Sequence, residues 1–119
     1  MPALEPELQQ QAQRFIDEWQ TIRETENERR GFSPPEPFSL HYNGGAFCKI
    51  VARNDAGTPT CVEAFIAVQD GENKSIGAYQ RGQIFKPHGW SMPARHARGT
   101  IWQHASEVAG PWGINYLRP

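Results

Sequence analysis

The stretch AFCKIVARNDAGTPTCVEAFIAV, residues 46–68, decides the fold of this chain. In its first part, Cys48, Ile50 and Ala52 alternate with other residues, the period of two that turns one face of a strand toward a core. NDAGTP has the composition of a turn, and CVEAFIAV, residues 61–68, is apolar almost throughout, as a central strand is. The stretch therefore predicts an antiparallel hairpin.

The hairpin also separates the two cysteines of the chain. A turn centred on Gly57 sets Cys61 opposite Ala52 and leaves Cys48 about four residues further along. A disulfide needs Cα atoms within about 7 Å of each other. We therefore expect two unpaired thiols, buried or half-buried in the sheet.

Upstream of the hairpin, residues 5–30 predict one amphipathic helix. Apolar side chains at spacings of three and four residues form a single stripe, which comprises Leu8, Ala12, Phe15, Trp19 and Ile22. Pro6 suits a first turn and Gly31 a C-terminal cap. The proline-rich residues 31–37 cannot be helical, so they are predicted to link the helix to the rest of the chain.

Downstream of the hairpin, short apolar runs (SIGAY and QIFK) alternate with turn sequences. Strands that follow one another this closely favour an antiparallel meander. The sequence thus predicts a single α+β domain, residues 1–119, in which an N-terminal amphipathic helix packs on a small antiparallel β-sheet of four or five strands. Residues 38–119 would form the β-rich core.

The last third of the chain is less regular. Ser91 could cap a short helical turn over residues 92–98, which Gly99 would end. Residues 100–107 are predicted to form a last strand or a short helix. The apolar side chains of the C-terminal segment are expected to dock on the core: Trp112, Ile114, Tyr116 and Leu117.

Charge is unevenly distributed along a chain whose formal net charge is −1. Residues 1–37 hold eight acids and four arginines, a net charge of −4, whereas residues 81–104 hold four basic residues and no acid. An electropositive segment on a nearly neutral protein points to an anionic ligand. The sequence has neither an apolar run of about 18 residues nor an apolar signal core, so we expect a cytoplasmic protein without membrane contact.

The positive charge is concentrated among aromatic residues in GWSMPARHARGTIW, residues 89–102. If residues 92–98 are helical, Arg95 and Arg98 share one face, where arginine forks grip phosphate oxygens in pairs. Exposed aromatic rings stack on bases of any sequence. The candidate nucleic-acid-binding residues are therefore Lys86, His88, Trp90, Arg95, His96 and Arg98.

A structural interpretation of the same stretch competes with this one. Tryptophans of a small domain are usually in the core, so Trp90 and Trp102 are expected to be mostly buried. The arginines would then bind backbone carbonyls or pair with the acidic N-terminal helix. The sequence alone leaves both interpretations open.

Other site chemistries find little support. The four histidines match no compact metal motif, because His88, His96 and His104 are spaced by eight residues. A nucleophilic pair of Cys48 or Cys61 with His96 is also formally possible. Both cysteines lie inside strand patterns, however, and not at a helix start or in an exposed loop, where the pKa of a thiol is lowered. The acidic residues do not cluster as a two-metal nuclease requires. We therefore predict no catalytic residue, metal or cofactor.

The order FCKIV, VEAFIAV and GQIFKPHGWSMPARHARGTIW resembles a largely uncharacterised family of small phage, prophage and plasmid proteins. In that family, two strands precede a block similar to G-D-I-x-K-x-x-x-W-x-x-P-A-K-H-A-R-G-N-I. The matching residues are Gly82, Ile84, Lys86, Trp90, Pro93, Ala94, Arg95, His96, Ala97, Arg98, Gly99 and Ile101. The match covers roughly residues 46–102, with Gln83 in place of the family's acid and Thr100 in place of its Asn. The resemblance implies a mobile-element origin, and with it a role in DNA metabolism or in interference with host processes.

These observations lead to three hypotheses of function. The first is a nucleic-acid-binding accessory protein of a phage or mobile element that uses the basic block. The second is a non-enzymatic effector that acts on a host protein through the acidic helix or the Trp-rich tail. The third, a small hydrolase or nuclease, ranks last because no persuasive catalytic pair is present.

Overall fold

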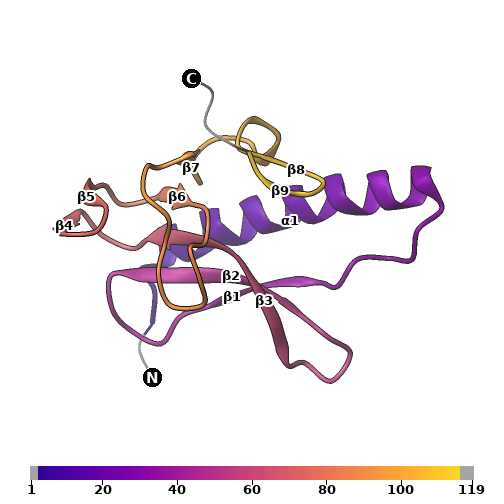
Figure 1. Ribbon diagram of the computed structural model, residues 1–119, viewed down its shortest axis with the longest axis horizontal. Coiled ribbons are helices and arrows are strands. Elements are labelled where there is room, and N and C mark those ends of the chain that lie inside the picture. Colours follow the sequence, from indigo (N-terminus) through magenta and orange to yellow (C-terminus); the bar gives the residue numbers. More distant parts are fainter. Residues whose placement is uncertain (1–2, 116–119) are drawn as a thin grey trace.

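A computed structural model of the chain describes residues 3–115 and has one long helix packed on a five-stranded antiparallel sheet (Figure 1). The helix α1 spans Pro6–Arg30. The strands of the main sheet are, in spatial order, β1 (Phe38–His41), β2 (Phe47–Arg53), β3 (Pro59–Ala67), β6 (Gln83–Phe85) and β7 (Gly99–Thr100). The predicted α+β class, with a helix on an antiparallel sheet, is confirmed.

Two small hairpins lie outside the main sheet. The first pairs β4 (Gly71–Asn73) with β5 (Gly77–Tyr79) and is inserted between β3 and β6. The second pairs β8 (Ala109–Gly110) with β9 (Gly113–Ile114) and follows a short 3-10 turn at Ala105–Glu107. The five main strands therefore lie in chain order, as in the predicted meander, but the predicted strand SIGAY pairs outside that sheet.

The predicted hairpin is the centre of the sheet. β2 and β3 pair antiparallel with Ala52 opposite Cys61 and Cys48 opposite Ile66, and a bulge interrupts the register after Ile50. Both cysteines are free, as predicted. Cys48 is buried, whereas Cys61 is exposed, so the expectation of two buried or half-buried thiols is wrong for Cys61.

The apolar stripe of α1 covers one face of the sheet. The buried side chains of α1 are Leu8, Ala12, Phe15, Ile16 and Trp19, and they share a core with Cys48, Ile50, Ala52, Ala64, Ile66 and Ile84. The Trp19 ring lies 4.6 Å from that of Phe38, and the Trp19 indole N–H donates to the Gly110 carbonyl at 2.9 Å. The helix ends as predicted at Gly31, which adopts φ 73°.

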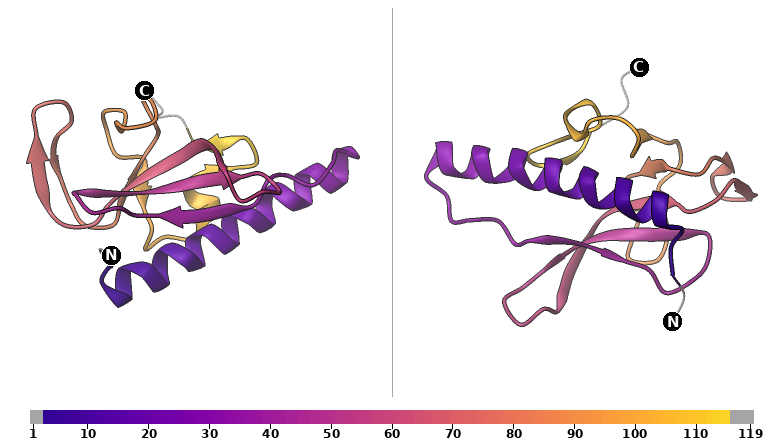
Figure 2. Two further views of the ribbon diagram at one scale, coloured as in Figure 1. Left: turned by 90° about the horizontal axis from the view of Figure 1, so that it is seen from below. Right: turned by 180° about the vertical axis from the view of Figure 1, so that it is seen from behind.

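The opposite face of the sheet has its own aromatic cluster. Phe47 lies 5.0 Å from Tyr79, 5.9 Å from Phe85 and 6.4 Å from Phe65, measured between ring centroids. Ile76 of the β4–β5 hairpin and Ala97 pack against this cluster. The second half of β3, residues 64–67, is buried on both faces, which explains why its sequence AFIA is entirely apolar. The left view of Figure 2 shows α1 below the sheet and the orange loop between β6 and β7 above it. The yellow segment after β7 lies beside α1 and shares its core.

The predicted helical turn at residues 92–98 is wrong. This segment instead returns alongside the chain that leaves β6, with Pro87 opposite Pro93. His88 N–H donates to the Met92 carbonyl at 2.9 Å and Ala94 N–H to the Lys86 carbonyl at 2.7 Å. The two prolines, which have no N–H to donate, occupy the position between these bonds, where an antiparallel ladder needs no donor.

The C-terminal segment docks only in part. Ile114 is buried, but Trp112 is 66 % exposed and rests on the Arg30 guanidinium, 5.3 Å from the ring centroid. The expected docking of Trp112 in the core is therefore wrong, and Tyr116 and Leu117 lie outside the described residues. Among residues 3–115, no helix is long and apolar enough to cross a membrane.

Candidate nucleic-acid interface

The segment Lys86–Arg98, hereafter the basic loop, crosses the face of the sheet that α1 leaves open (Figure 1). Its base is fixed to β6 by the Arg98 N–H, which donates to the Ile84 carbonyl at 2.8 Å. Its tip is fixed to β2 by Lys49, whose ammonium donates to the Trp90 carbonyl at 2.7 Å. The basic loop is thus held at both ends without helical structure.

Trp90 projects from the tip of the basic loop and is 51 % exposed. The Lys49 ammonium lies 5.2 Å from its ring centroid and 5.5 Å from that of Phe65. Lys49 therefore holds Trp90 above the aromatic cluster by a cation–π contact and a hydrogen bond. The expectation that Trp90 is mostly buried is wrong.

Trp102 is also exposed, at 40 %, which contradicts the same expectation for this residue. Its ring lies over Gly82, where a Cβ atom would come within 2.5 Å of the indole. The Arg81 guanidinium is 5.0 Å from the ring centroid. Trp102 thus belongs to a contact between Arg81 and the start of α1, separate from the basic loop.

A groove of about 420 Å³ opens beside the tip of the basic loop. It is lined by Lys74, Ser75, His88, Met92, Pro93, Ala94 and Arg95, and no acidic residue lines it. His88 and Arg95 are exposed, as is Lys74 on the β4–β5 hairpin. None of these three side chains has a hydrogen bond or ion pair with another residue between 3 and 115. The groove therefore presents uncompensated positive charge beside an exposed indole.

The other predicted site residues do not line this groove. Arg98 is half-buried and donates from Nη1 to the Asn115 carbonyl at 3.0 Å, which fits the structural interpretation. Lys86 is engaged in the fold and lines a different pocket, beside the β8–β9 hairpin. His96 is exposed and adopts φ 69°, a left-handed conformation that few residues other than glycine adopt. Of the six candidates, His88 and Arg95 therefore line the groove, and Trp90 lies at the adjoining tip of the basic loop. Lys86, His96 and Arg98 lie elsewhere.

Two basic residues of this surface, Lys49 and Lys74, are not among the candidates predicted from the sequence. Lys49 was recognisable only as the polar side of the β2 alternation, and its contact with Trp90 joins residues 41 positions apart. Lys74 lies in the turn between β4 and β5, and no sequence pattern links it to Arg95. Both assignments depend on tertiary structure.

The alternative that the arginines of the basic block pair with the acidic helix is wrong for Arg95 and Arg98, within residues 3–115. The ion pairs to the start of α1 come from Arg81, which binds Glu5 at 2.8 Å and Glu7 at 2.9 Å. The acidic side chains of α1 are therefore not used to neutralise the basic loop.

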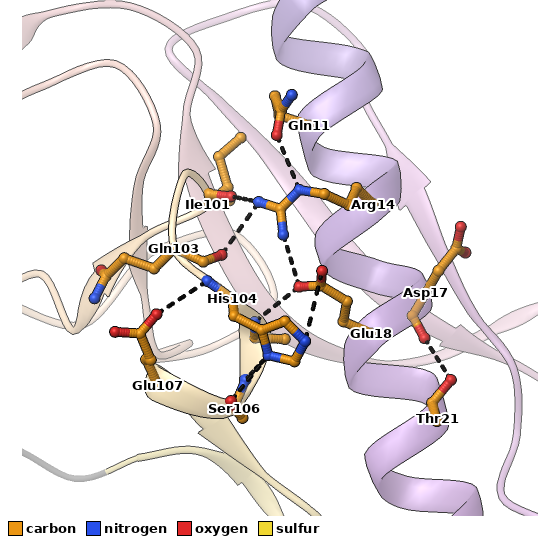
Figure 3. A network of polar contacts seen from close by, with 11 residues as sticks. Gln11, Arg14, Asp17, Glu18, Thr21, Ile101, Gln103, His104, Ser106 and Glu107 are labelled. Carbon is orange, nitrogen blue, oxygen red and sulfur yellow. Dashed lines mark hydrogen bonds and ion pairs between the residues drawn. The ribbon is translucent and has the colours of Figure 1, made fainter.

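A second polar network joins α1 to the segment after β7 (Figure 3). The Arg14 guanidinium donates to the carbonyls of Ile101 and Gln103 and binds Glu18 at 2.6 Å. Burial raises the pKa of Glu18, but the Ala105 N–H and Arg14 lower it by more, so the net pKa lies below its usual value. This network fixes the chain around the 3-10 turn, and Arg14 and Glu18 neutralise each other within it.

The cysteines are poorly suited to nucleophilic chemistry. Burial raises the pKa of the Cys48 thiol to about 12. Burial, together with the neighbouring Glu63 carboxylate, raises that of Cys61 to about 11. Within residues 3–115, no three His, Cys, Asp or Glu side chains gather in a way that could hold a metal ion.

Comparison of the chain with protein-family models, with curated proteins and with solved structures finds no match.

Proposed function

We propose that this protein binds single-stranded nucleic acid through the tip of the basic loop, as an accessory protein of a phage or mobile element in the cytoplasm of its host. The observation that carries the proposal is the exposed Trp90 indole beside a groove whose charged side chains are all basic. The mobile-element setting rests on the resemblance of residues 46–102.

The chemistry of the groove fits a phosphate backbone. Arg95 supplies a planar fork that can bind two phosphate oxygens, and Lys74 supplies a point charge. Because neither side chain has a partner in residues 3–115, a phosphate would gain these contacts without breaking an existing ion pair. His88 adds a further donor when it is protonated.

The position of Trp90 favours a single strand over a duplex. Its ring stands at the tip of the loop with Lys49 behind it, so one unpaired base can stack on the open side. A base inside a duplex has no free face to offer. The Lys49 contacts fix the indole before binding and reduce the ordering cost.

Fluorescence anisotropy with short single-stranded and duplex DNA and RNA, at two salt concentrations, tests the proposal. Arg95→Ala should weaken binding and reduce the slope of log K against log salt by about 0.7 for a single strand. Trp90→Ala should cost about 1–3 kcal/mol of stacking, a loss of affinity of roughly 5- to 150-fold. Arg29→Ala, which removes an exposed arginine from the end of α1, is the matched control. Absence of salt-dependent binding, or an Arg95 variant that behaves like the control, refutes the proposal.

The effector hypothesis remains a second candidate because of a different surface. At the C-terminal end of α1, Phe32 is 55 % exposed beside unpaired acidic residues. An exposed aromatic residue with a charged border is typical of a protein-binding site. Such a site would act on a host protein without any catalytic residue.

A further inference from the structure

A preformed groove of about 460 Å³ lies where α1 meets the proline-rich linker. Its lining comprises Glu24, Asn27, Glu28, Phe32, Pro34 and Pro35. The walls are apolar on the linker side and acidic on the helix side. This groove is separate from the basic loop, so its occupation by a ligand does not depend on nucleic-acid binding.

The backbone of the groove is held rigidly. Gly31 takes the left-handed conformation that ends the helix, and the Phe32 N–H donates to the Asn27 carbonyl at 2.8 Å. The Asn27 side-chain amide donates to the Ser33 carbonyl at 3.1 Å, and the ring of Pro34 fixes its own φ. A ligand therefore meets a surface that needs little ordering.

The charges of the groove are not balanced within the fold. Arg29 and Arg30 both bind Glu26, at 2.5 and 2.6 Å, and these hydrogen bonds lower the pKa of Glu26 to about 2. The side chains of Glu24 and Glu28 are exposed, and their carboxylates have no hydrogen bond or ion pair with another residue between 3 and 115. They lie one helical turn apart near the negative end of the helix dipole, where two carboxylates are unfavourable for stability.

We propose that this groove docks a basic, apolar segment of a partner protein. One apolar side chain of the segment packs on Phe32 and Pro34, and flanking Lys or Arg side chains bind Glu24 and Glu28. The charge complementarity selects the partner: two unpaired carboxylates beside an exposed phenyl ring attract a cationic segment and repel an acidic one. Within the effector hypothesis, this names the chemistry of the host partner.

Selection from a display library of random short peptides on the immobilised full-length chain tests the proposal. The selected sequences should be enriched in Lys and Arg around an apolar residue. Phe32→Ser and the double variant Glu24→Lys/Glu28→Lys should each weaken binding of a selected peptide at least about tenfold. Asp17→Lys, an equal change per site on the exposed side of the same helix, should not.

Two further measurements complete the test: NMR locates the bound peptide, and light scattering shows whether the free chain self-associates. Amide chemical shifts on adding the peptide should change around residues 24–34. Peptides without basic enrichment, equal binding by the charge-reversed variant, or shifts confined to other surfaces would overturn the proposal. So would self-association of the chain in light scattering that the double variant abolishes, because a second copy would then be the occupant.

Discussion

Replacing Arg14 with Met should destabilise the fold through a segment almost ninety residues away. The aliphatic stem is retained, and only the guanidinium is lost. The carbonyls of Ile101 and Gln103 then lose their donor, and Glu18 loses a charged partner at 2.6 Å. These contacts are part of the polar network that holds the chain after β7 against the middle of α1 (Figure 3). The Ala105 N–H bond to Glu18 does not require Arg14.

The expected loss in the free energy of unfolding can be worked out from the contacts of Arg14. Hydrogen bonds from a charged group contribute about 1.5–3 kcal/mol each when desolvated, but the Arg14 side chain is 33 % exposed and its bonds are not additive. We therefore expect a loss of about 2–3 kcal/mol in the free energy of unfolding. A surface ion pair alone would contribute about 0–1 kcal/mol.

Urea unfolding followed by tryptophan fluorescence measures this loss, with Arg29→Met as the control. Arg29 is also paired with a glutamate of α1, but it has no bond outside the helix among residues 3–115, so its variant should unfold at nearly the same urea concentration as the parent chain. If the two variants are equally stable, Arg14 does not fasten the C-terminal segment and the reasoning fails.

The same experiment has a defined pH dependence. The folded-state pKa of Glu18 is depressed, so its stabilisation is complete above its unfolded pKa of about 4.3 and is lost as the pH falls through the folded value. Removing Arg14 removes one cause of that depression. The stability difference between the parent chain and the Arg14 variant should therefore be largest near neutral pH and shrink below about pH 4.

Two further predictions concern Glu28 and the two cysteines. Glu28→Lys should raise the free energy of unfolding by about 0.5–1 kcal/mol, because it removes repulsion from Glu24 and suits the end of the helix dipole; denaturant midpoints measure this gain. The thiol pKa values are about 11 for Cys61 and about 12 for Cys48, so both thiols should react slowly with a disulfide reagent at pH 8. Cys61 should react before Cys48 because it is exposed. The Cys61 rate should rise about tenfold per pH unit up to its pKa, and fast reaction at pH 8 would contradict this.

Local periodicity accounts for the parts of the fold that the sequence predicts. The stripe of α1 is readable because Leu8 to Trp19 recur at helical spacing, and the β2–β3 hairpin because a turn separates two strand patterns. Ile16 was missed because it lies beside that stripe in the sequence, yet α1 buries it against the sheet. These errors are small because each element is specified by neighbouring residues.

The basic loop shows where local reasoning stops. Ser91 and Gly99 have the signature of helix caps, but the pairing of Pro87 with Pro93 prevails because β6 supplies the edge that a return strand needs. The exposure of Trp90 depends on Lys49, which is distant in the sequence. Composition could therefore indicate Arg95 as a candidate. It could not indicate that the Arg98 guanidinium would instead donate to the Asn115 carbonyl.

The bonds between α1 and the end of the described chain have a consequence for biosynthesis. The helix is made early, but Trp19 finds its acceptor, the Gly110 carbonyl, 91 residues later. At a translation rate of about 5–20 residues per second, that interval lasts roughly 5–20 s. Throughout it, the apolar stripe from Leu8 to Trp19 lacks the C-terminal part of its cover. A nascent chain that stalls before Gly110 would present this stripe to chaperones and proteases.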